Sequence, residues 1–335
     1  MASQIGVLGA GGWGTALAKV LADKGEQITL WCHGADCYRA IVSQRENPIY
    51  LPGIKLPANI TATQALDQAV EHKTLVIYAL PSHVVRGVLA AVGAKLDAEA
   101  MVLCGTKGLE EGSLKTMGEL FTDLFGSARN RRHAFLSGPS FASEVARQLP
   151  AAVTVAAHDE SVARSIQQIL STRYLRVYTS TDVTGVQIGG VVKNVIAIAA
   201  GISDGLNLGQ NARAALITRG LAEMTRLAVR MGADPLTLAG LPGLGDLILT
   251  CAGDLSRNRA VGLQIATGKS LQEITGATRM IAEGVRNTRS LYDLAQRLEV
   301  ETPIIDQMYQ VLYAGKKPAE AVQNLMDRSL KAEAG

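Results

Sequence analysis

Short β-branched runs alternate with amphipathic stretches along the chain up to about residue 180. Strands that alternate with helices in this way indicate βαβ units and a mostly parallel sheet. The expected strands are Gln4–Leu8, Gln27–Trp31, Thr74–Ala79, Met101–Cys104, Ala134–Ser137, Ala152–Ala156 and Leu175–Tyr178. The expected helices between them include Gly12–Lys24, His83–Leu96, Ser113–Leu124 and Glu160–Leu170.

The periodicity changes after Tyr178, where the polar segment Thr179–Asp182 is typical of a linker or a helix N-cap. Beyond it apolar residues recur at helical spacing, most clearly over Ala212–Met231, and no strand is expected. Further helices are expected at Arg286–Leu298 and Pro318–Leu330. The pattern therefore predicts an α/β domain over residues 1–180 and an all-helical domain over residues 181–335.

A glycine-rich turn links the first expected strand to the first expected helix. Residues 5–18 read IGVLGAGGWGTALA, which places Gly9, Gly11 and Gly14 in the spacing G-x-G-x-x-G. In a βαβ unit these glycines make a tight turn, let the backbone approach a pyrophosphate and allow close packing of helix on strand. The helix N-terminus then offers free N–H groups to the phosphates. This context predicts a Rossmann-type dinucleotide-binding domain; the alternative is a tight turn with a purely structural role.

The second expected strand ends without the acidic residue that usually binds the ribose 2′-hydroxyl of NAD. It runs into Leu30–Gly34, where His33 could favour a 2′-phosphate. The protein is therefore expected to use NADPH or NADH and to prefer NADPH. The alternative is that His33 only packs over the adenine as a surface polar residue.

Composition excludes several other classes of protein. The 335 residues carry a net charge of only +3 and 4% aromatic residues, which does not match a nucleic-acid-binding surface. None of the four cysteines has C-x-x-C spacing, so no metal site is expected. A signal peptide begins with a positively charged segment, but no basic residue precedes Lys19 in this chain. The apolar segment Val183–Ser203 contains Lys193 and is better explained as a buried helix than as a membrane span. The four cysteines are interpreted as reduced thiols, so a cytoplasmic enzyme is expected.

Two lysines stand out because of their place in the pattern. Lys107 follows an expected strand in the small-residue run GTKG, and ligands of open α/β sheets bind beyond the carboxyl ends of strands. Lys193 is the only charged residue between Asp182 and Asp204. Burial would lower its pKa and allow proton exchange near neutral pH. The alternatives are an ordinary solvated lysine at 107 and an ammonium that reaches solvent at 193.

A second glycine cluster, Gly240–Asp246, precedes the polar run Ser256–Arg259. An arginine fork with serine and asparagine donors matches the geometry of a phosphate group. Asp246 has no basic neighbour in the sequence, which favours a role in orienting a cation within a site. The alternative for the polar run is an exposed basic loop.

With these motifs in place, the chain resembles bacterial NAD(P)-dependent glycerol-3-phosphate dehydrogenases over essentially its whole length. The matching blocks are Gly9–Gly14, Asn47–Gly53, Thr106–Glu110, Gly138–Ala146, Lys193–Gly205, Ala214–Leu227, Gly240–Cys251, Ser256–Arg259 and Glu283–Gly284. The resemblance implies reversible NAD(P)H-dependent reduction of dihydroxyacetone phosphate to sn-glycerol 3-phosphate by hydride transfer. It also implies that the product supplies glycerophospholipid synthesis.

The resemblance further implies roles for individual residues. Lys193 would accept the proton in the oxidation direction, Lys107 would contact both substrate and cofactor, and Asp246 would complete the catalytic group. The substrate would be lined by Gly138, Ser140, Asp246, Ser256, Arg257 and Asn258, and by Thr250, which matches a polar residue of the eukaryotic site. The cofactor would contact Gly12, Trp13, His33, Ala142, Arg257, Ile281 and Glu283. In the reduction direction the Lys193 ammonium would protonate the alkoxide that develops at the substrate C2 carbonyl.

Two other functions are compatible with the motifs. Another two-domain dehydrogenase, of the 3-hydroxyacid or ketopantoate type, would share the fingerprint and a catalytic lysine, although the phosphate-binding run argues against a substrate without phosphate. A nucleotide-sensing protein would keep the fold, but Lys107, Lys193 and Asp246 argue against a loss of chemistry. Because the helical domain has abundant apolar surface, a homodimer is expected.

The lack of an acid after the second expected strand leads to a prediction about cofactor choice. The KM for NADPH should be lower than that for NADH, because nothing in Leu30–Gly34 repels a 2′-phosphate. Gly34 stands where many members of the family carry a charged residue, a departure that bears on the size of the preference. Initial rates with each cofactor measure it, and a strong preference for NADH would contradict the prediction.

Overall fold

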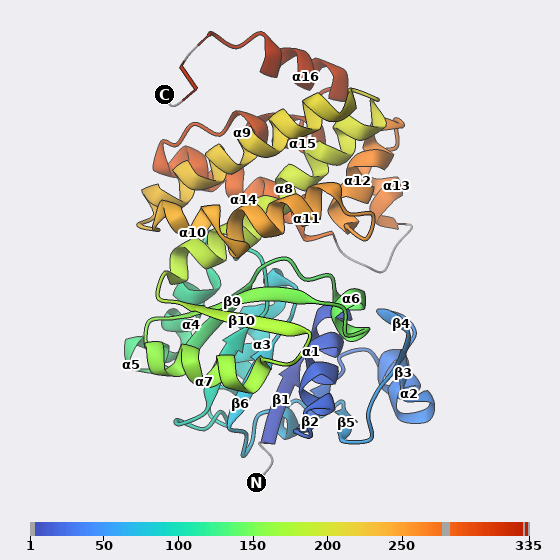
Figure 1. The fold of residues 1–335 in the computed structure, drawn as a ribbon, viewed down its shortest axis with the longest axis vertical. Coiled ribbons are helices and arrows are strands. Elements are labelled where there is room, and N and C mark those ends of the chain that lie inside the picture. The colour runs from blue at the N-terminus through green and yellow to red at the C-terminus, as the bar shows by residue number, and fades with distance from the viewer. Residues whose placement is uncertain (1–3, 277–281, 331, 334–335) are drawn as a thin grey trace.

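The computed structural model describes residues 4–276, 282–330 and 332–333. Its strands all lie before residue 181, and the elements described after that residue are helices joined by loops. Figure 1 shows the two parts stacked along the long axis of the molecule, with the sheet in the lower part and the later helices above it. The fold is an N-terminal Rossmann-like domain followed by a helical C-terminal domain, as the sequence predicts.

The N-terminal elements alternate as a doubly wound fold requires. The strands are β1 (Gln4–Leu8), β2 (Gln27–Trp31), β3 (Glu46–Asn47), β4 (Leu51–Lys55), β5 (Ile60–Thr63), β6 (Leu75–Tyr78), β7 (Met101–Cys104), β8 (His133–Ser137), β9 (Ala151–Ala157) and β10 (Leu175–Ser180). The helices are α1 (Gly12–Asp23), α2 (Ala35–Gln44), α3 (Val85–Val92), α4 (Met117–Phe125), α5 (Ser127–Asn130), α6 (Ala142–Ala146) and α7 (Glu160–Leu170), with the 3-10 turns η1 (Asp67–Ala69) and η2 (Ser82–Val84).

One eight-stranded sheet forms the centre of this domain, in the order β10-β9-β8-β7-β6-β1-β2-β5. Its neighbours are parallel except for β8 and β9, which confirms the expected mostly parallel sheet. The chain leaves β1 toward β2 on one side and returns to β6 on the other. The loops that follow β1 and β6 therefore diverge, and such a switch point is where open α/β sheets bind ligands.

Three strands lie outside the expected set. The strand β4 contains Pro52 and Gly53, which usually interrupt strands, and its partner β3 has only two residues. These two strands form a separate antiparallel pair rather than part of the main sheet, and β5 lies at the edge of that sheet. Proline and glycine are tolerated there because edge positions need fewer ladder hydrogen bonds.

The expected helix Ser113–Leu124 starts later in the structure, at Met117. Thr116 caps it: its hydroxyl accepts a hydrogen bond from the Glu119 N–H at 3.2 Å, and the Glu119 carboxylate accepts one from the Thr116 N–H at 2.8 Å. This capping box fixes the helix start. Leu114 has a φ of +60°, which no helix accommodates, so residues before Thr116 form a loop that follows β7. The expected helix His83–Leu96 likewise shortens to η2 and α3.

The elements described after residue 181 are helices. They are α8 (Val183–Gly205), α9 (Gly209–Arg230), α10 (Pro235–Ala239), the π-helical turn η3 (Leu241–Gly245), α11 (Asp246–Ala252), α12 (Arg257–Ala266), α13 (Leu271–Gly276), α14 (Glu283–Leu298), α15 (Pro303–Tyr313) and α16 (Pro318–Met326). The helices expected from periodicity correspond to α9, α14 and α16, with ends displaced by a few residues.

Helix α8 is the centre of the helical domain and packs against α9, α11, α12 and α14. The Asp182 carboxylate accepts a hydrogen bond from the Gly185 N–H at 2.8 Å, so the polar segment before α8 is an N-cap. In the described part of the chain, α8 is the one helix long and apolar enough to cross a membrane, yet 94% of its apolar window is buried inside the protein. It therefore serves as a core helix, as the lysine within it led us to expect.

A buried carboxylate joins two helices of this domain. Glu223 on α9 is 1% exposed and accepts hydrogen bonds from the backbone N–H groups of Ile304 at 2.7 Å and Ile305 at 3.2 Å. These donors belong to the first turn of α15 and have no intrahelical acceptor. Burial raises the pKa of Glu223 to about 8, even though the two N–H groups favour the carboxylate.

Glu223 should make stability depend on pH. The pKa of Glu223 rises from 4.5 in the unfolded chain to about 8 in the folded protein. Between these two pH values the native state keeps the proton that the unfolded chain has released. Its stabilising contribution is complete below the unfolded pKa and is lost as pH rises, by up to about 1.4 kcal/mol per pH unit. Glu223→Gln removes the titration, so the melting temperature of wild type should fall relative to that of the variant as the pH rises from about 5 to about 8.

Thermal unfolding followed by circular dichroism at each pH measures the difference. Glu160→Gln on the exposed face of α7 is the matched control and should leave the pH dependence of wild type unchanged. Parallel curves for wild type and Glu223→Gln would contradict the prediction.

Candidate active site

The loop after β1 has the backbone geometry of a phosphate-binding turn. Gly9 has a φ of +109°, a conformation that residues with a side chain rarely adopt. A Cβ on Gly14 would lie 1.9 Å from the Gly9 carbonyl oxygen, so only glycine lets α1 approach the turn this closely. A Cβ on Gly11, in contrast, would meet nothing within 4 Å. The turn is therefore tightly built on one side and open on the side where a ligand can approach.

The start of α1 suits an anionic ligand. No side chain caps this helix, and its first turn contains no acidic residue. Its first N–H groups and its positive dipole end can therefore serve a pyrophosphate. The buried Trp13 Nε1 has no hydrogen-bond partner among the described residues, and it lies next to Gly105 at the end of β7. Gly12 lies beside Ala142, so several expected cofactor contacts gather at this edge of the sheet.

The remaining cofactor candidates lie at the margins of the site. His33 follows β2, is exposed and lies with its ring 5.7 Å from that of Trp31. Glu283 begins α14 and accepts a hydrogen bond from the Ser82 hydroxyl of η2 at 3.2 Å, so it joins the two domains. Burial raises the pKa of Glu283. Ile281 lies outside the described residues.

Asp246 is the centre of the catalytic candidates. Its Oδ2 accepts a hydrogen bond from Lys107 Nζ at 2.7 Å, and its Oδ1 accepts one from Lys193 Nζ. Lys193 Nζ also donates to Thr250 Oγ1 at 3.0 Å, and that hydroxyl donates to the Asp246 carbonyl at 2.6 Å. The structure thus brings together four residues that the sequence analysis selected from three separate segments. The Lys193 ammonium does not reach bulk solvent, because its side chain is only 9% exposed.

Close packing of α8 against the second glycine cluster sets this geometry. A Cβ on Gly189 would lie 2.4 Å from the Pro242 carbonyl oxygen, so glycine permits η3 to lie directly on α8, one turn before Lys193. The π-helical turn η3 leads directly into α11, whose first residue is Asp246. A carboxylate in the first turn of a helix is stabilised by the helix dipole. The glycines therefore place the carboxylate within reach of Lys193.

The electrostatics of the cluster follow from its burial. Burial lowers the pKa of Lys193; the Asp246 carboxylate opposes this effect and the nearby Lys107 cation adds to it, which leaves the pKa at about 7. Burial also disfavours ionisation of Asp246, but the two ammonium groups outweigh it and hold the pKa of this carboxyl below its usual value. Asp246 is therefore charged at neutral pH, whereas Lys193 can gain and lose a proton there.

The loops after β7 and β8 meet at Lys107. Its Nζ also donates to the Gly138 carbonyl at 3.4 Å, and the Ser140 hydroxyl donates to the same carbonyl at 2.9 Å. Ser137, at the end of β8, is 3% exposed, and its Oγ has no partner among the described residues. A Cβ on Gly190 would contact both this Oγ and the Lys107 side chain. The unpaired Ser137 hydroxyl at this point is suited to a polar substrate.

The polar run Ser256–Arg259 is the start of α12 and not an exposed loop. Ser256 caps the helix, its hydroxyl accepting from the Arg259 N–H at 3.2 Å, and Arg259 pairs with Asp204 at 2.8 Å. These two side chains therefore have structural partners. Arg257 is exposed, and no described residue accepts a hydrogen bond from its guanidinium, so it can bind an anion.

Asn258 has a partner on each side of its amide. Its Nδ2 donates to Asn194 Oδ1 at 2.8 Å and its Oδ1 accepts from the Gly284 N–H at 2.9 Å. This bridge ties α12 to α8 beside Lys193 and to the start of α14. Asn258 thereby holds the three helices around the site in register.

Several residues near the site were not predicted from the sequence. Asn194 is the buried partner of Asn258, and its signal was an amide inside an otherwise apolar segment. Asn47 is fully buried and donates to the Ala10 carbonyl at 2.8 Å and to Thr15 Oγ1 at 2.9 Å, which supports the glycine turn. Ser137 gave no signal, because a serine at a strand end is common. Asn194 and Asn47 find their partners only when distant segments of the chain pack together.

Two family models together match nearly the whole chain. The model for the NAD-dependent glycerol-3-phosphate dehydrogenase N-terminus matches residues 4–163, and that for its C-terminus matches residues 182–323. A curated NAD(P)+-dependent glycerol-3-phosphate dehydrogenase from Geobacter sp. (strain M21) is 54% identical over 333 residues, which is 99% of each chain.

Solved structures give the same result. The crystal structure of glycerol-3-phosphate dehydrogenase from Coxiella burnetii has a TM-score of 0.93 at 40% identity and covers 98% of this chain and 99% of its own. A putative 2-dehydropantoate 2-reductase from Enterococcus faecalis has a TM-score of 0.54 at 13% identity, covering 96% of this chain and 99% of its own, a likeness of fold alone. A dehydrogenase of the ketopantoate type is therefore not favoured.

Proposed function

This chain belongs to the NAD-dependent glycerol-3-phosphate dehydrogenase family, and from that premise we propose how its residues perform the reaction. It catalyses the reversible NAD(P)H-dependent reduction of dihydroxyacetone phosphate to sn-glycerol 3-phosphate, a step of lipid metabolism. The observation that carries the residue assignment is the buried pair of Lys193 and Asp246, with Lys107 on the second carboxylate oxygen.

Lys193 is the proposed proton donor and acceptor. The bound nicotinamide cofactor supplies or accepts the hydride at the substrate C2 carbon. As negative charge develops on the carbonyl oxygen during reduction, the Lys193 ammonium stabilises it and transfers a proton to it. In the oxidation direction the neutral Lys193 amine takes the hydroxyl proton. A pKa of about 7 lets one side chain perform both steps near neutral pH.

Asp246 and Lys107 set the charge around this lysine. Asp246 holds the Lys193 ammonium in place through Oδ1, and Thr250 accepts a second hydrogen bond from it. Lys107 pairs with Asp246 and offers its ammonium group to the substrate oxygens, with Gly138 and Ser140 at the neighbouring loop. The fixed charges need not reorganise during the reaction, which is the main source of electrostatic catalysis.

Arg257 is the proposed anchor of the substrate phosphate, with Ser256 and Asn258 beside it. Its exposed guanidinium has no acceptor among the described residues, and a planar guanidinium binds a phosphate through two parallel hydrogen bonds. Binding energy from this remote group helps to orient the reacting carbon at Lys193.

The cofactor is assigned to the turn after β1 and its neighbours. Gly9, Gly11, Gly12 and Gly14 form the phosphate turn, and the unpaired Trp13 Nε1 next to Gly105 offers one donor. Further contacts are proposed for His33, Lys107, Ala142, Arg257, Ile281 and Glu283. On this assignment residues 1–180 bind the cofactor and residues 181–335 complete the substrate site. We also propose a cytoplasmic homodimer, on the basis of the composition and the apolar surface of the helical domain.

Lys193→Ala should lower kcat by orders of magnitude, because it removes the group that protonates the alkoxide. Binding of NADPH should persist, and quenching of tryptophan fluorescence measures it. In wild type, kcat/KM for reduction should fall as pH rises through about 7, since the ammonium is the proton donor, and the oxidation rate should rise over the same range. Near-normal turnover of a folded Lys193→Ala protein would refute the assignment.

Arg257→Ala should mainly raise the KM for dihydroxyacetone phosphate, by about 10- to 100-fold, equivalent to ~1.5–3 kcal/mol for a charged hydrogen bond. Unphosphorylated dihydroxyacetone at saturating NADPH is the internal control: because it lacks the phosphate and the cofactor site is filled, its kcat/KM should be the same for wild type and variant. Arg164→Ala on the exposed face of α7 controls for loss of a surface charge. An unchanged KM for the phosphorylated substrate would contradict the clamp.

A further inference from the structure

Lys107 lies on a loop, whereas Lys193 and Asp246 lie on helices. The loop, residues 105–116, joins β7 to α4 and has no regular secondary structure of its own. Loops of this kind are usually mobile, and a displacement of about 1 Å at a catalytic group can cost 100-fold in rate. Some part of the structure must therefore hold this loop in place.

Two leucines fix the loop to the helical domain. Leu109 is 1% exposed and Leu114 is 8% exposed, and both belong to the hydrophobic core built from helices after residue 181. Asn287 on α14 donates to the Lys107 carbonyl at 3.4 Å, and Arg297 on the same helix donates to the Ser113 carbonyl at 3.3 Å. The loop thus belongs to the cofactor domain by sequence and to the helical domain by packing.

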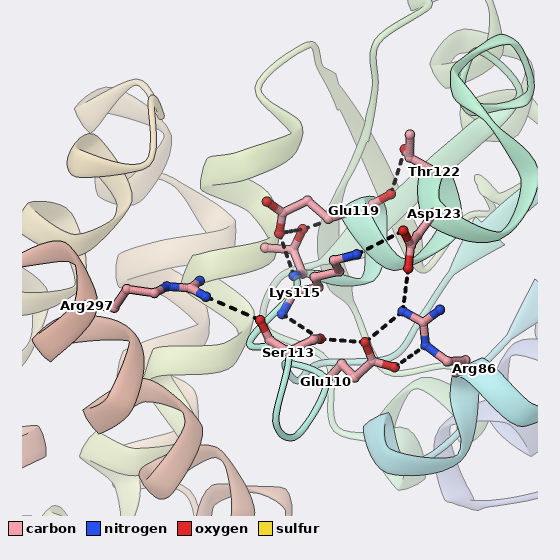
Figure 2. A network of polar contacts seen from close by, with 10 residues as sticks. Arg86, Glu110, Ser113, Lys115, Glu119, Thr122, Asp123 and Arg297 are labelled. Atoms are coloured by element: carbon pink, nitrogen blue, oxygen red, sulfur yellow. Dashed lines mark hydrogen bonds and ion pairs between the residues drawn. The ribbon is translucent and has the colours of Figure 1, made fainter.

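Glu110 fixes the same loop from the opposite side. Its carboxylate accepts hydrogen bonds from Arg86 Nε at 2.5 Å, from Arg86 Nη2 at 2.8 Å and from Ser113 Oγ at 2.5 Å. Its backbone closes the loop: Glu110 N–H donates to the Lys115 carbonyl at 2.9 Å, and Leu114 N–H donates to the Glu110 carbonyl at 3.0 Å. Figure 2 shows Arg86 reaching Glu110 from one side of the loop and Arg297 reaching Ser113 from the other.

Arg86 and Lys115 both pair with Asp123, and these ion pairs connect the Glu110 network to α4. Arg86 on α3 also binds Asp123 at 2.8 Å, and Asp123 binds Lys115 at 2.9 Å (Figure 2). Isolated surface ion pairs contribute little to stability, but a bidentate arginine within a network is an exception. The Glu110 side chain is 14% exposed, and its pairing with Arg86 holds the pKa of the carboxyl below its usual value.

We propose that Glu110 is a positioning residue for Lys107: with Arg86 it holds the loop so that the Lys107 ammonium stays on Asp246. Glu110 is three residues from Lys107 and contacts neither Lys193 nor Asp246, so it acts through the loop alone. The inference rests on the proposed role of Lys107. A purely structural role for Glu110 would lower stability without changing the chemistry at Lys193.

A double-mutant cycle between Glu110 and Lys107 tests this proposal. Glu110→Gln should lower kcat/KM for dihydroxyacetone phosphate by about 10- to 100-fold, and Glu110→Asp should restore part of the loss. When Lys107 is already Ala, adding Glu110→Gln should cost almost nothing further, because the residue that it positions is gone. Equal losses in the presence and absence of Lys107 would overturn the proposal.

The pH profile gives a second readout that a structural role would not move. The Lys107 cation helps to lower the pKa of Lys193, while Asp246 opposes it and Cys251 lies nearby in the field of the same lysine. If the loop loosens, the Lys107 charge withdraws, so the alkaline limb of kcat/KM should move to higher pH in Glu110→Gln. An unshifted limb together with reduced activity would also count against the proposal.

Glu119→Gln is the matched control. Glu119 lies on the same helix start as this network but caps α4 and does not bond to Glu110 or Arg86. It should lower the melting temperature and leave kcat/KM and the pH profile unchanged. Should Glu110→Gln fail to fold, Arg86→Gln removes the same contact from a half-exposed position and should give the same pattern in the cycle.

The outcomes distinguish a failure of the Glu110 role from a failure of the proposed active site. If Lys107→Ala is impaired and neither Glu110→Gln nor Arg86→Gln is, the positioning role fails and the proposed active site stands. If Lys107→Ala retains full activity, the assigned role of Lys107 fails, and the positioning role fails with it.

Discussion

One buried carboxylate, shared by two ammonium groups from different domains, is the interaction on which the rest of the structure depends. Asp246 is 1% exposed and would be strongly disfavoured as an ion without partners. Lys193 meets it from α8 and Lys107 from the loop after β7. Removing one partner from such a group leaves an uncompensated buried charge, which is far more costly than never having formed the pair. The relative position of the two domains is therefore tied to the integrity of the site.

The charge balance of this cluster explains its chemistry. With both lysines protonated, two positive charges face one negative charge, and the remaining positive charge suits an anionic substrate and a developing alkoxide. The same surplus, added to burial, brings the pKa of Lys193 to about 7. On the proposed roles, the charge that would bind the substrate also prepares the proton transfer. Arg257 is exposed and is not among the charges that shift the pKa of Lys193 or Asp246, so the proposed phosphate contact would leave that balance unchanged.

The sequence predicted those features that depend on local pattern. The alternating strands, the glycine turn and the lone charge of Lys193 in an apolar helix are visible without a structure. The pairing of Lys107 with Asp246 is not, because 139 residues separate them and nothing local indicates the contact. The start of α4 was missed because the helical periodicity continues before it, although the capping box of Thr116 and Glu119 is a sequence signature of that start. Asn194 was missed because its partner, Asn258, comes from a distant helix.

The two lysines reach the same carboxylate by different structural means, and this difference decides which distant residues matter. Lys193 is placed by a rigid helix, and the glycine at 189 lets η3 pack directly against its backbone. Lys107 has no such support, so its loop must be held by side chains: leucines in the helical core on one face and a bidentate carboxylate on the other. Packing tolerates little change in shape, whereas a hydrogen-bonded network tolerates little change in charge. Substitutions remote from the substrate should therefore affect the two lysines selectively: changes of volume near α8 act on Lys193, and changes of charge around the 105–116 loop act on Lys107.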